Sequence, residues 1–156
     1  MRIAVIEDER PIREGLVHIL NKISPEYQVV GSAENGREGL ILLEEQDPDL
    51  ILLDIQMPDM DGLQMLKEAR ARGIYTKVII LTAYSDFSYA KKAIELGIEN
   101  YLLKPVNLTE LKKTLEKIKE ELFVEQRGKN SPSLEQILKD ILDGEYEKNE
   151  RLDAVL

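Results

Sequence analysis

The sequence predicts an α/β protein in which five parallel strands form one sheet covered by helices on both faces. Short apolar segments alternate five times with longer segments whose apolar residues recur every three or four positions. Continuous apolar strands followed by amphipathic helices are typical of parallel sheets. Because crossovers between parallel strands are right-handed, we expect a doubly wound sheet with the strand order 2-1-3-4-5.

Each element follows from its local sequence. The strands are expected at residues 3–6, 27–30, 50–53, 77–81 and 101–103. Residues favoured at or just before a first helical turn predict that the helices begin at Pro11, Asn35-Gly36, Gly62, Asp86 and Asn107. Glycines are expected to end the second strand, the third helix and the fourth helix, at Gly31, Gly73 and Gly97. The apolar face of the fourth helix is expected to contain Phe87, Ala90, Ile94 and Leu96.

The composition excludes several classes of protein. The 156 residues contain no cysteine, which excludes disulfides, thiol catalysis and cysteine-bound metals. The first residues show no signal-peptide pattern, and no apolar run reaches the roughly 18 residues of a membrane helix, so we expect a cytoplasmic protein with no membrane partner. The formal net charge of -9 argues against direct binding of nucleic acid, because such binding depends on basic surfaces.

Acidic residues follow two of the expected strands at the point where each strand ends. Glu7 and Asp8 follow the first strand, and Asp54 follows the third. Ligands of open parallel sheets bind at the carboxyl ends of the strands, where strands one and three are neighbours. Three carboxylates that meet there repel one another unless one binds a proton or a cation joins them. We therefore expect a hard divalent cation such as Mg²⁺ to bind there and to offset this repulsion.

A hydroxyl and an amine are expected at the same edge, because Thr82 and Lys104 follow the fourth and fifth strands. Beside a bound cation they would suit a transferred phosphoryl group, since lysine neutralises its oxygens and the hydroxyl donates a hydrogen bond. Each residue also has a plain structural reading: Asp54 or Thr82 could cap a turn, and Lys104 could be an ordinary solvated lysine. Their convergence favours the functional interpretation.

Four features occur in order along the chain: the pair Glu7-Asp8, the box from Asp54 to Gly62 with Met57-Pro58 and Asp61, then Thr82-Ala83, and Lys104-Pro105. With these features, residues 1–123 resemble the receiver domain of a two-component response regulator, whose fold is flavodoxin-like. The segments 84–87 and 103–106 are similar to those of receivers joined to AraC-type helix-turn-helix output domains.

The resemblance implies a phosphoacceptor and a metal site. Asp54 would accept a phosphoryl group from a phosphohistidine of a partner sensor histidine kinase, and the domain would catalyse its own phosphorylation and dephosphorylation. Mg²⁺ or Mn²⁺ would be bound by Asp8, by Asp54 and by the backbone carbonyl of Gln56. Glu7 would bind the cation through water.

The resemblance also implies that some residues change position or partners when Asp54 is phosphorylated. Lys104 would pair with the acyl phosphate, Thr82 would move inward on phosphorylation, and Tyr101 would move with it. The Lys104–Pro105 peptide bond is a candidate for the cis form. The expected function is therefore a signalling switch that regulates transcription.

Other interpretations of the same carboxylates fit less well. A haloacid-dehalogenase-type phosphatase would have a second aspartate two residues after the nucleophile, where this chain has Gln56. A flavodoxin would have a Ser/Thr/Gly-rich phosphate loop after the first strand, where this chain has an acidic triplet. The alternative that stays open is a receiver-like module that binds partners without being phosphorylated.

Residues 124–156 are expected to be a linker and a short amphipathic helix that connect to a missing output domain, through which alone the protein would contact DNA. A break is expected at residues 128–132, with a helix after Pro132. In the preceding helix, apolar residues at alternating three- and four-residue steps fit either packing on the sheet or a helix–helix seam. These residues are Leu108, Leu111, Leu115, Ile118 and Leu122. A homodimer through that helix or through the C-terminal extension is a candidate assembly.

Overall fold

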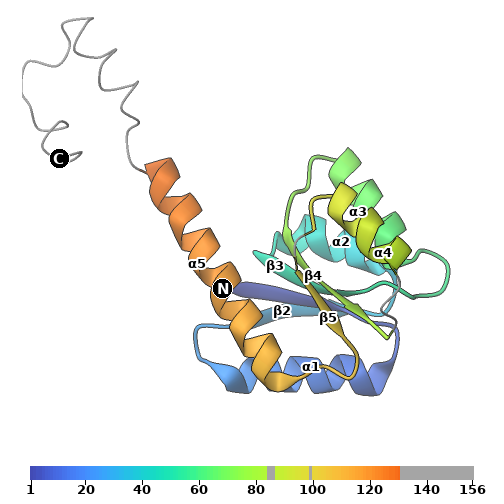
Figure 1. The fold of residues 1–156 in the computed structure, drawn as a ribbon, viewed down its shortest axis with the longest axis horizontal. Coiled ribbons are helices and arrows are strands. Elements are labelled where there is room, and N and C mark those ends of the chain that lie inside the picture. The colour runs from blue at the N-terminus through green and yellow to red at the C-terminus, as the bar shows by residue number, and fades with distance from the viewer. Residues whose placement is uncertain (84–86, 99, 131–156) are drawn as a thin grey trace, which may run out of the picture. The chain divides into compact units, whose positions relative to one another are not determined.

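A five-stranded sheet organises the first part of the chain (Figure 1). The computed structural model describes residues 1–83, 87–98 and 100–130. The strands are β1 (Arg2–Ile6), β2 (Gln28–Ala33), β3 (Leu50–Asp54), β4 (Lys77–Thr82) and β5 (Asn100–Leu103). The helices are α1 (Arg10–Ile23), α2 (Gly36–Gln46), α3 (Gly62–Ala71), α4 (Phe87–Glu95) and α5 (Leu108–Asn130). The chain divides into two units after Leu115, and the sheet lies in the first.

The sheet has the predicted topology. All strand pairs are parallel and the order is β2-β1-β3-β4-β5, which confirms the predicted fold class. Helix α1 covers one face, and α2, α3 and α4 cover the other (Figure 1). Strand β3 pairs with both β1 and β4, and residues Leu50–Leu53 have no exposed surface. Since burying one such side chain contributes about 1.5–3 kcal/mol, this strand is a main source of stability.

The strand register brings the polar residues to one edge. Ile6, the last residue of β1, lies beside Leu53 of β3. The next residues of the two strands, Glu7 and Asp54, therefore emerge side by side at the carboxyl ends of these strands. On the other side of β3, Asp54 lies beside Leu81.

Strand β2 does not end at Gly31, where the sequence predicted its end, but continues to Ala33. The register between β1 and β2 shifts between Ile3 and Ala4, an irregularity of the bulge type. An ideal Cβ at Gly31 would lie 2.6 Å from Cδ1 of Leu42. The glycine therefore lets α2 approach the strand closely, which is a common reason for glycine inside a strand.

Ile94 does not belong to the buried face of α4, contrary to the sequence prediction. It is 71% exposed, whereas its neighbour Ala93 is buried. Successive residues of a helix point about 100° apart, so a helix that buries Ala93 turns Ile94 towards solvent. The expected cap, Asp86, lies outside the described residues, as do the side chains of Phe87 and Ala90.

Helix α5 continues to Asn130, through the point at Gly128 where the sequence predicted a break. It begins as expected, because Oδ1 of Asn107 accepts a hydrogen bond from the N–H of Glu110 at 3.1 Å. A glycine costs a helix only about 1 kcal/mol relative to alanine, and a proline that would stop it occurs only at Pro132. The helix expected after Pro132 falls within residues 131–156, which lie outside the described part of the chain.

Two apolar residues in the early turns of α5 are buried. Leu111 and Leu115 are at most 1% exposed, whereas Phe123 and Val124 are 60% and 66% exposed. Packing therefore accounts for Leu111 and Leu115, whereas Leu108, the first residue of the spacing, is 47% exposed. The homodimer stays a prediction. Across residues 1–83, 87–98 and 100–130, no helix has both the length and the hydropathy needed to cross a bilayer.

The loop between β3 and α3 is held against the end of β3. An ideal Cβ at Gly62, the first residue of α3, would lie 2.4 Å from the backbone oxygen of Asp54. The N–H of Gly62 donates a hydrogen bond to the carbonyl of Ile55 at 2.8 Å. Asp61 caps α3 by accepting a hydrogen bond from the N–H of Gln64 at 2.8 Å. This close approach requires the glycine.

The substitution Gly62→Ala should lower the free energy of unfolding by about 1–3 kcal/mol, because its Cβ would collide with backbone that cannot move aside. Gly15→Ala is the matched control, since an ideal Cβ at Gly15 in α1 has no neighbour within 4 Å. That change should raise stability by about 0.5–1 kcal/mol. Urea denaturation measures both. Equal effects of the two substitutions would contradict the close approach.

Candidate functional site

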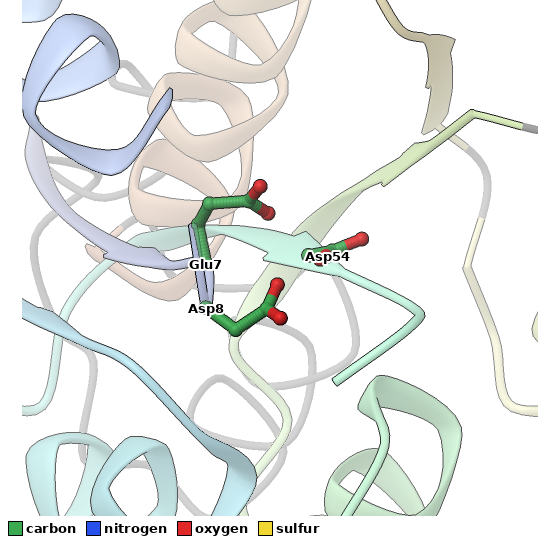
Figure 2. A group of neighbouring side chains, drawn as sticks. All are labelled: Glu7, Asp8 and Asp54. Carbon is green, nitrogen blue, oxygen red and sulfur yellow. The ribbon is translucent and has the colours of Figure 1, made fainter. Parts of the chain in front are cut away.

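Three carboxylates lie together at the carboxyl edge of the sheet. Glu7 and Asp8 directly follow β1, and Asp54 is the last residue of β3. Each offers one oxygen, and these oxygens lie within 4.8 Å of one another. The three side chains extend to the same side of the strand ends (Figure 2). We call this group the acidic cluster.

Lys104, the residue after β5, joins the acidic cluster. Its Nζ lies 2.6 Å from Oε1 of Glu7 and 3.5 Å from Oδ1 of Asp54. The lysine side chain is only 14% exposed, so this ion pair is largely protected from water. The sequence assigned Lys104 to a phosphate, but here its nearest partner is Glu7.

Glu7 lacks a complete set of partners. The residue is fully buried, and its Oε2 accepts no hydrogen bond from any group in the described part of the chain. A buried polar atom without a partner costs about 1–3 kcal/mol, and more when the group is charged. A proton on the neighbouring carboxylate of Asp54, or a cation between the two, would remove this cost.

The acidic cluster fits a hard divalent cation. Its donors are carboxylate oxygens alone, which is the ligand type that Mg²⁺ prefers. An added positive charge would give Oε2 of Glu7 a partner and would reduce the repulsion among the closely spaced carboxylates. These residues could therefore hold a metal ion.

Two groups at this edge of the sheet, Asp54 and Lys104, have shifted pKa values. Burial, and after it the neighbouring Glu7, raise the pKa of Asp54 to about 8, although the positive charge of Lys104 offsets part of the rise. Burial disfavours the ammonium of Lys104, but its hydrogen bond to Glu7 and the charge of Asp54 outweigh this effect, so the pKa of Lys104 is raised. Without a metal ion near neutral pH, Asp54 therefore tends to keep a proton while Lys104 keeps its charge.

The structure also locates the other residues named from the sequence. The N–H of Gln56 donates a hydrogen bond to Oδ1 of Asp54 at 3.3 Å. Thr82, buried at the end of β4, accepts a hydrogen bond at its carbonyl from the N–H of Lys104 at 2.7 Å. Tyr101 is half-buried and packs against the core. The peptide bond between Lys104 and its successor Pro105 is cis.

Sequence reasoning missed Arg13 of α1. Nη1 of this arginine donates hydrogen bonds to the backbone carbonyls of Glu7 at 2.8 Å and of Asp8 at 3.3 Å. Its position in the first turn of the helix that follows the acidic pair was a signal that could have found it. Arg13 therefore contacts the segment that carries two of the three carboxylates.

The substitution Asp54→Asn should stabilise the metal-free protein at about pH 8 by at least about 1 kcal/mol. The pKa of Asp54 is about 8 in the folded chain against an ordinary value of 3.8, so the folded wild type binds more protons than the unfolded chain between these values. Its free energy of unfolding must therefore fall as the pH rises through that window, whereas an asparagine has no proton to lose. Urea denaturation in EDTA at about pH 5 and about pH 8 measures the difference. A wild-type protein that is equally stable at both pH values would contradict the shift.

The chain is similar to known proteins in sequence. Residues 3–116 match the family model described as the response regulator receiver domain. The chain is 35% identical over 121 residues to the uncharacterized transcriptional regulatory protein YesN of Bacillus subtilis, which covers 78% of this chain and 33% of that protein. It is 35% identical over 133 residues to the transcriptional regulatory protein HptR of Staphylococcus aureus, which covers 85% of this chain and 52% of that protein. The chain thus spans about half or less of the length of these curated relatives.

Solved structures show the same fold. The REC domain of AraT, a response regulator from Geobacillus stearothermophilus, is 38% identical with a TM-score of 0.71, and the match covers 80% of this chain and 97% of that chain. A DNA-binding response regulator of the LuxR family from Staphylococcus aureus is 31% identical with a TM-score of 0.70, covering 75% and 97%. Given the acidic cluster with its lysine and a family match over residues 3–116, this chain belongs to the receiver domains of two-component response regulators.

Proposed function

We propose that this receiver domain is a signalling switch in which Asp54 accepts a phosphoryl group. A carboxylate oxygen of Asp54 forms a bond to phosphorus, and the bond from phosphorus to an imidazole nitrogen of the kinase phosphohistidine breaks, with the electron pair staying on nitrogen. The observation that supports this proposal is the position of Asp54 at the end of β3, 3.5 Å from Nζ of Lys104 and beside two further carboxylates.

The residues of the chain supply binding and charge for this step. Asp8 and Asp54 would offer carboxylate oxygens to Mg²⁺ or Mn²⁺, Glu7 would bind the cation through water, and the backbone carbonyl of Gln56 would be a further ligand. When bound, the cation would neutralise charge on the transferring phosphoryl oxygens. Lys104 is held by Glu7 at 2.6 Å, so its ammonium is already close to the acceptor before phosphate arrives.

Phosphorylation adds negative charge where the switch residues lie. The hydroxyl of Thr82 donates a hydrogen bond to the phosphoryl group, and Tyr101 follows its movement. Two observations support this coupling. The carbonyl of Thr82 accepts a hydrogen bond from the N–H of Lys104, and Tyr101 is only partly buried where it packs against the core. A two-state domain whose active state gains contacts to the added charge would respond in this way.

The output of the switch is the regulation of transcription. The names of YesN and HptR as transcriptional regulatory proteins support this, and the LuxR-family relative of known structure is described as DNA-binding. The partners are a sensor histidine kinase and, through residues 124–156, an output domain of the AraC type that contacts DNA. The receiver boundary at residue 123, a homodimer and a cytoplasmic location remain predictions.

Incubation of the full chain with Mg²⁺ and a small phosphodonor should add one acid-labile phosphoryl group at Asp54. Intact-mass measurement and peptide mapping locate it, and Asp54→Asn should abolish it because an amide cannot form the acyl phosphate. Label on another residue, or label that survives in Asp54→Asn, would contradict the assignment. A partner whose affinity does not respond to the phosphodonor would favour the phosphorylation-independent interaction module instead.

The substitution Asp8→Ala should weaken Mg²⁺ binding near neutral pH by at least about tenfold, because it removes a direct carboxylate ligand. Glu9→Ala is the control, since Glu9 is the next acidic residue, is exposed and makes no side-chain cap to α1. It removes the same charge and should leave the affinity within about twofold. Isothermal titration calorimetry measures both variants. Unchanged affinity in Asp8→Ala would remove Asp8 from the metal site.

A further inference from the structure

We infer that Arg13 is a positioning residue for the metal-binding carboxylates: its guanidinium holds the Glu7–Asp8 segment in the geometry that a divalent cation needs. This inference rests on the proposed function, since it concerns the same metal site. The hydrogen bonds that carry it run from the guanidinium to the backbone of two metal ligands rather than to their carboxylates.

The backbone of the Glu7–Asp8 segment leaves the sheet at this point. Strand β1 ends at Ile6, and the N–H of Glu7 still donates a hydrogen bond to the carbonyl of Ala33 at 3.0 Å. Beyond that bond, Nη1 of Arg13 fixes both following peptide groups, because it donates to the carbonyls of Glu7 and Asp8. Two successive peptide planes determine the directions in which the two acidic side chains leave the backbone.

Arg13 is itself firmly placed. It lies in the first turns of α1, and its N–H donates a hydrogen bond to the carbonyl of Glu9 at 2.9 Å. Its side chain is half-buried, so the hydrogen bonds to the carbonyls are partly shielded from competing water. Hydrogen bonds from a charged donor are roughly twice as strong as neutral ones. Helix α1 thus holds the Glu7–Asp8 segment through the side chain of Arg13.

Charge and positioning predict opposite effects of Arg13 on metal binding. A fixed cation close to the acidic cluster repels a divalent ion, so loss of the charge alone would tighten Mg²⁺ binding. Loss of a group that orients metal ligands instead weakens binding, commonly by about 10–100-fold. The sign of the change therefore separates the two roles.

The chain offers a matched control in Arg10. This arginine lies on the same helix and carries the same charge, but its Nε is bonded to Oε1 of the exposed Glu14 at 2.8 Å. Replacing Arg10 therefore removes a similar charge from α1 without removing a bond to the Glu7–Asp8 segment.

The experiment measures the Mg²⁺ dissociation constant of the full chain by isothermal titration calorimetry near neutral pH. Arg13→Met keeps the apolar part of the side chain and should weaken binding about tenfold or more. Arg13→Lys keeps the charge and one donor and should recover to within about threefold of the wild type. Arg10→Met should stay within about twofold. Arg13→Ala, a good helix former, is measured in parallel and should show the same loss as Arg13→Met.

Thermal unfolding in EDTA separates positioning from general damage. A purely structural role would lower the melting temperature of the Arg13 variants and leave the dissociation constant of the folded protein unchanged, which would overturn the inference. Tighter or unchanged Mg²⁺ binding in Arg13→Met and Arg13→Ala would overturn it as well, and so would an equal loss in Arg10→Met. A wild-type chain that does not bind Mg²⁺ would instead refute the proposed metal site.

Discussion

The burial of two carboxylates beside a single ammonium group is the constraint on which this structure depends. Glu7 and Asp54 are 0% and 4% exposed, and Nζ of Lys104 lies within 2.6 Å and 3.5 Å of their oxygens. Removing one partner of a buried ion pair typically costs about 3–5 kcal/mol, because the other charge stays buried. One ammonium cannot neutralise three carboxylates, so the edge retains an excess of negative charge that a proton or a cation must balance.

The apolar sheet creates this constraint, and Lys104 connects it to the rest of the domain. Residues Leu50–Leu53 exclude water from the centre of the sheet, so the carboxylate at the end of β3 is desolvated and its pKa rises. The backbone N–H of Lys104 is bonded to the carbonyl of Thr82, while its side chain contacts Glu7 and Asp54. A change of charge at Asp54 therefore acts on Lys104, which is also bonded to Thr82 at the end of β4 and to Glu7 after β1.

Local sequence rules were wrong at three positions, each for its own physical reason. Gly31 suggested the end of a strand, but the side chain of Leu42 explains why a glycine stands inside that strand. Ile94 fitted the apolar period of α4, but the helix buries Ala93 instead. Gly128 suggested a break, yet the helix continues because a single glycine is a small cost. In each case a second physical effect outweighed the local pattern: the contact with Leu42, the burial of Ala93 and the low cost of one glycine in a helix.

The order of the strands and helices, and the polar residues that stand at the strand ends, could be predicted from the amino-acid sequence. Both follow from local periodicity and from the geometry of parallel strands, which needs no knowledge of side-chain contacts. The tertiary contacts were needed to show that Lys104 pairs with Glu7 and that Arg13 donates to the carbonyls of the Glu7–Asp8 segment. They also show that Oε2 of Glu7 has no donor among the described residues. The physical reason is that these pairings depend on distances of a few ångströms between elements remote in sequence, and such distances are set by how the whole core packs.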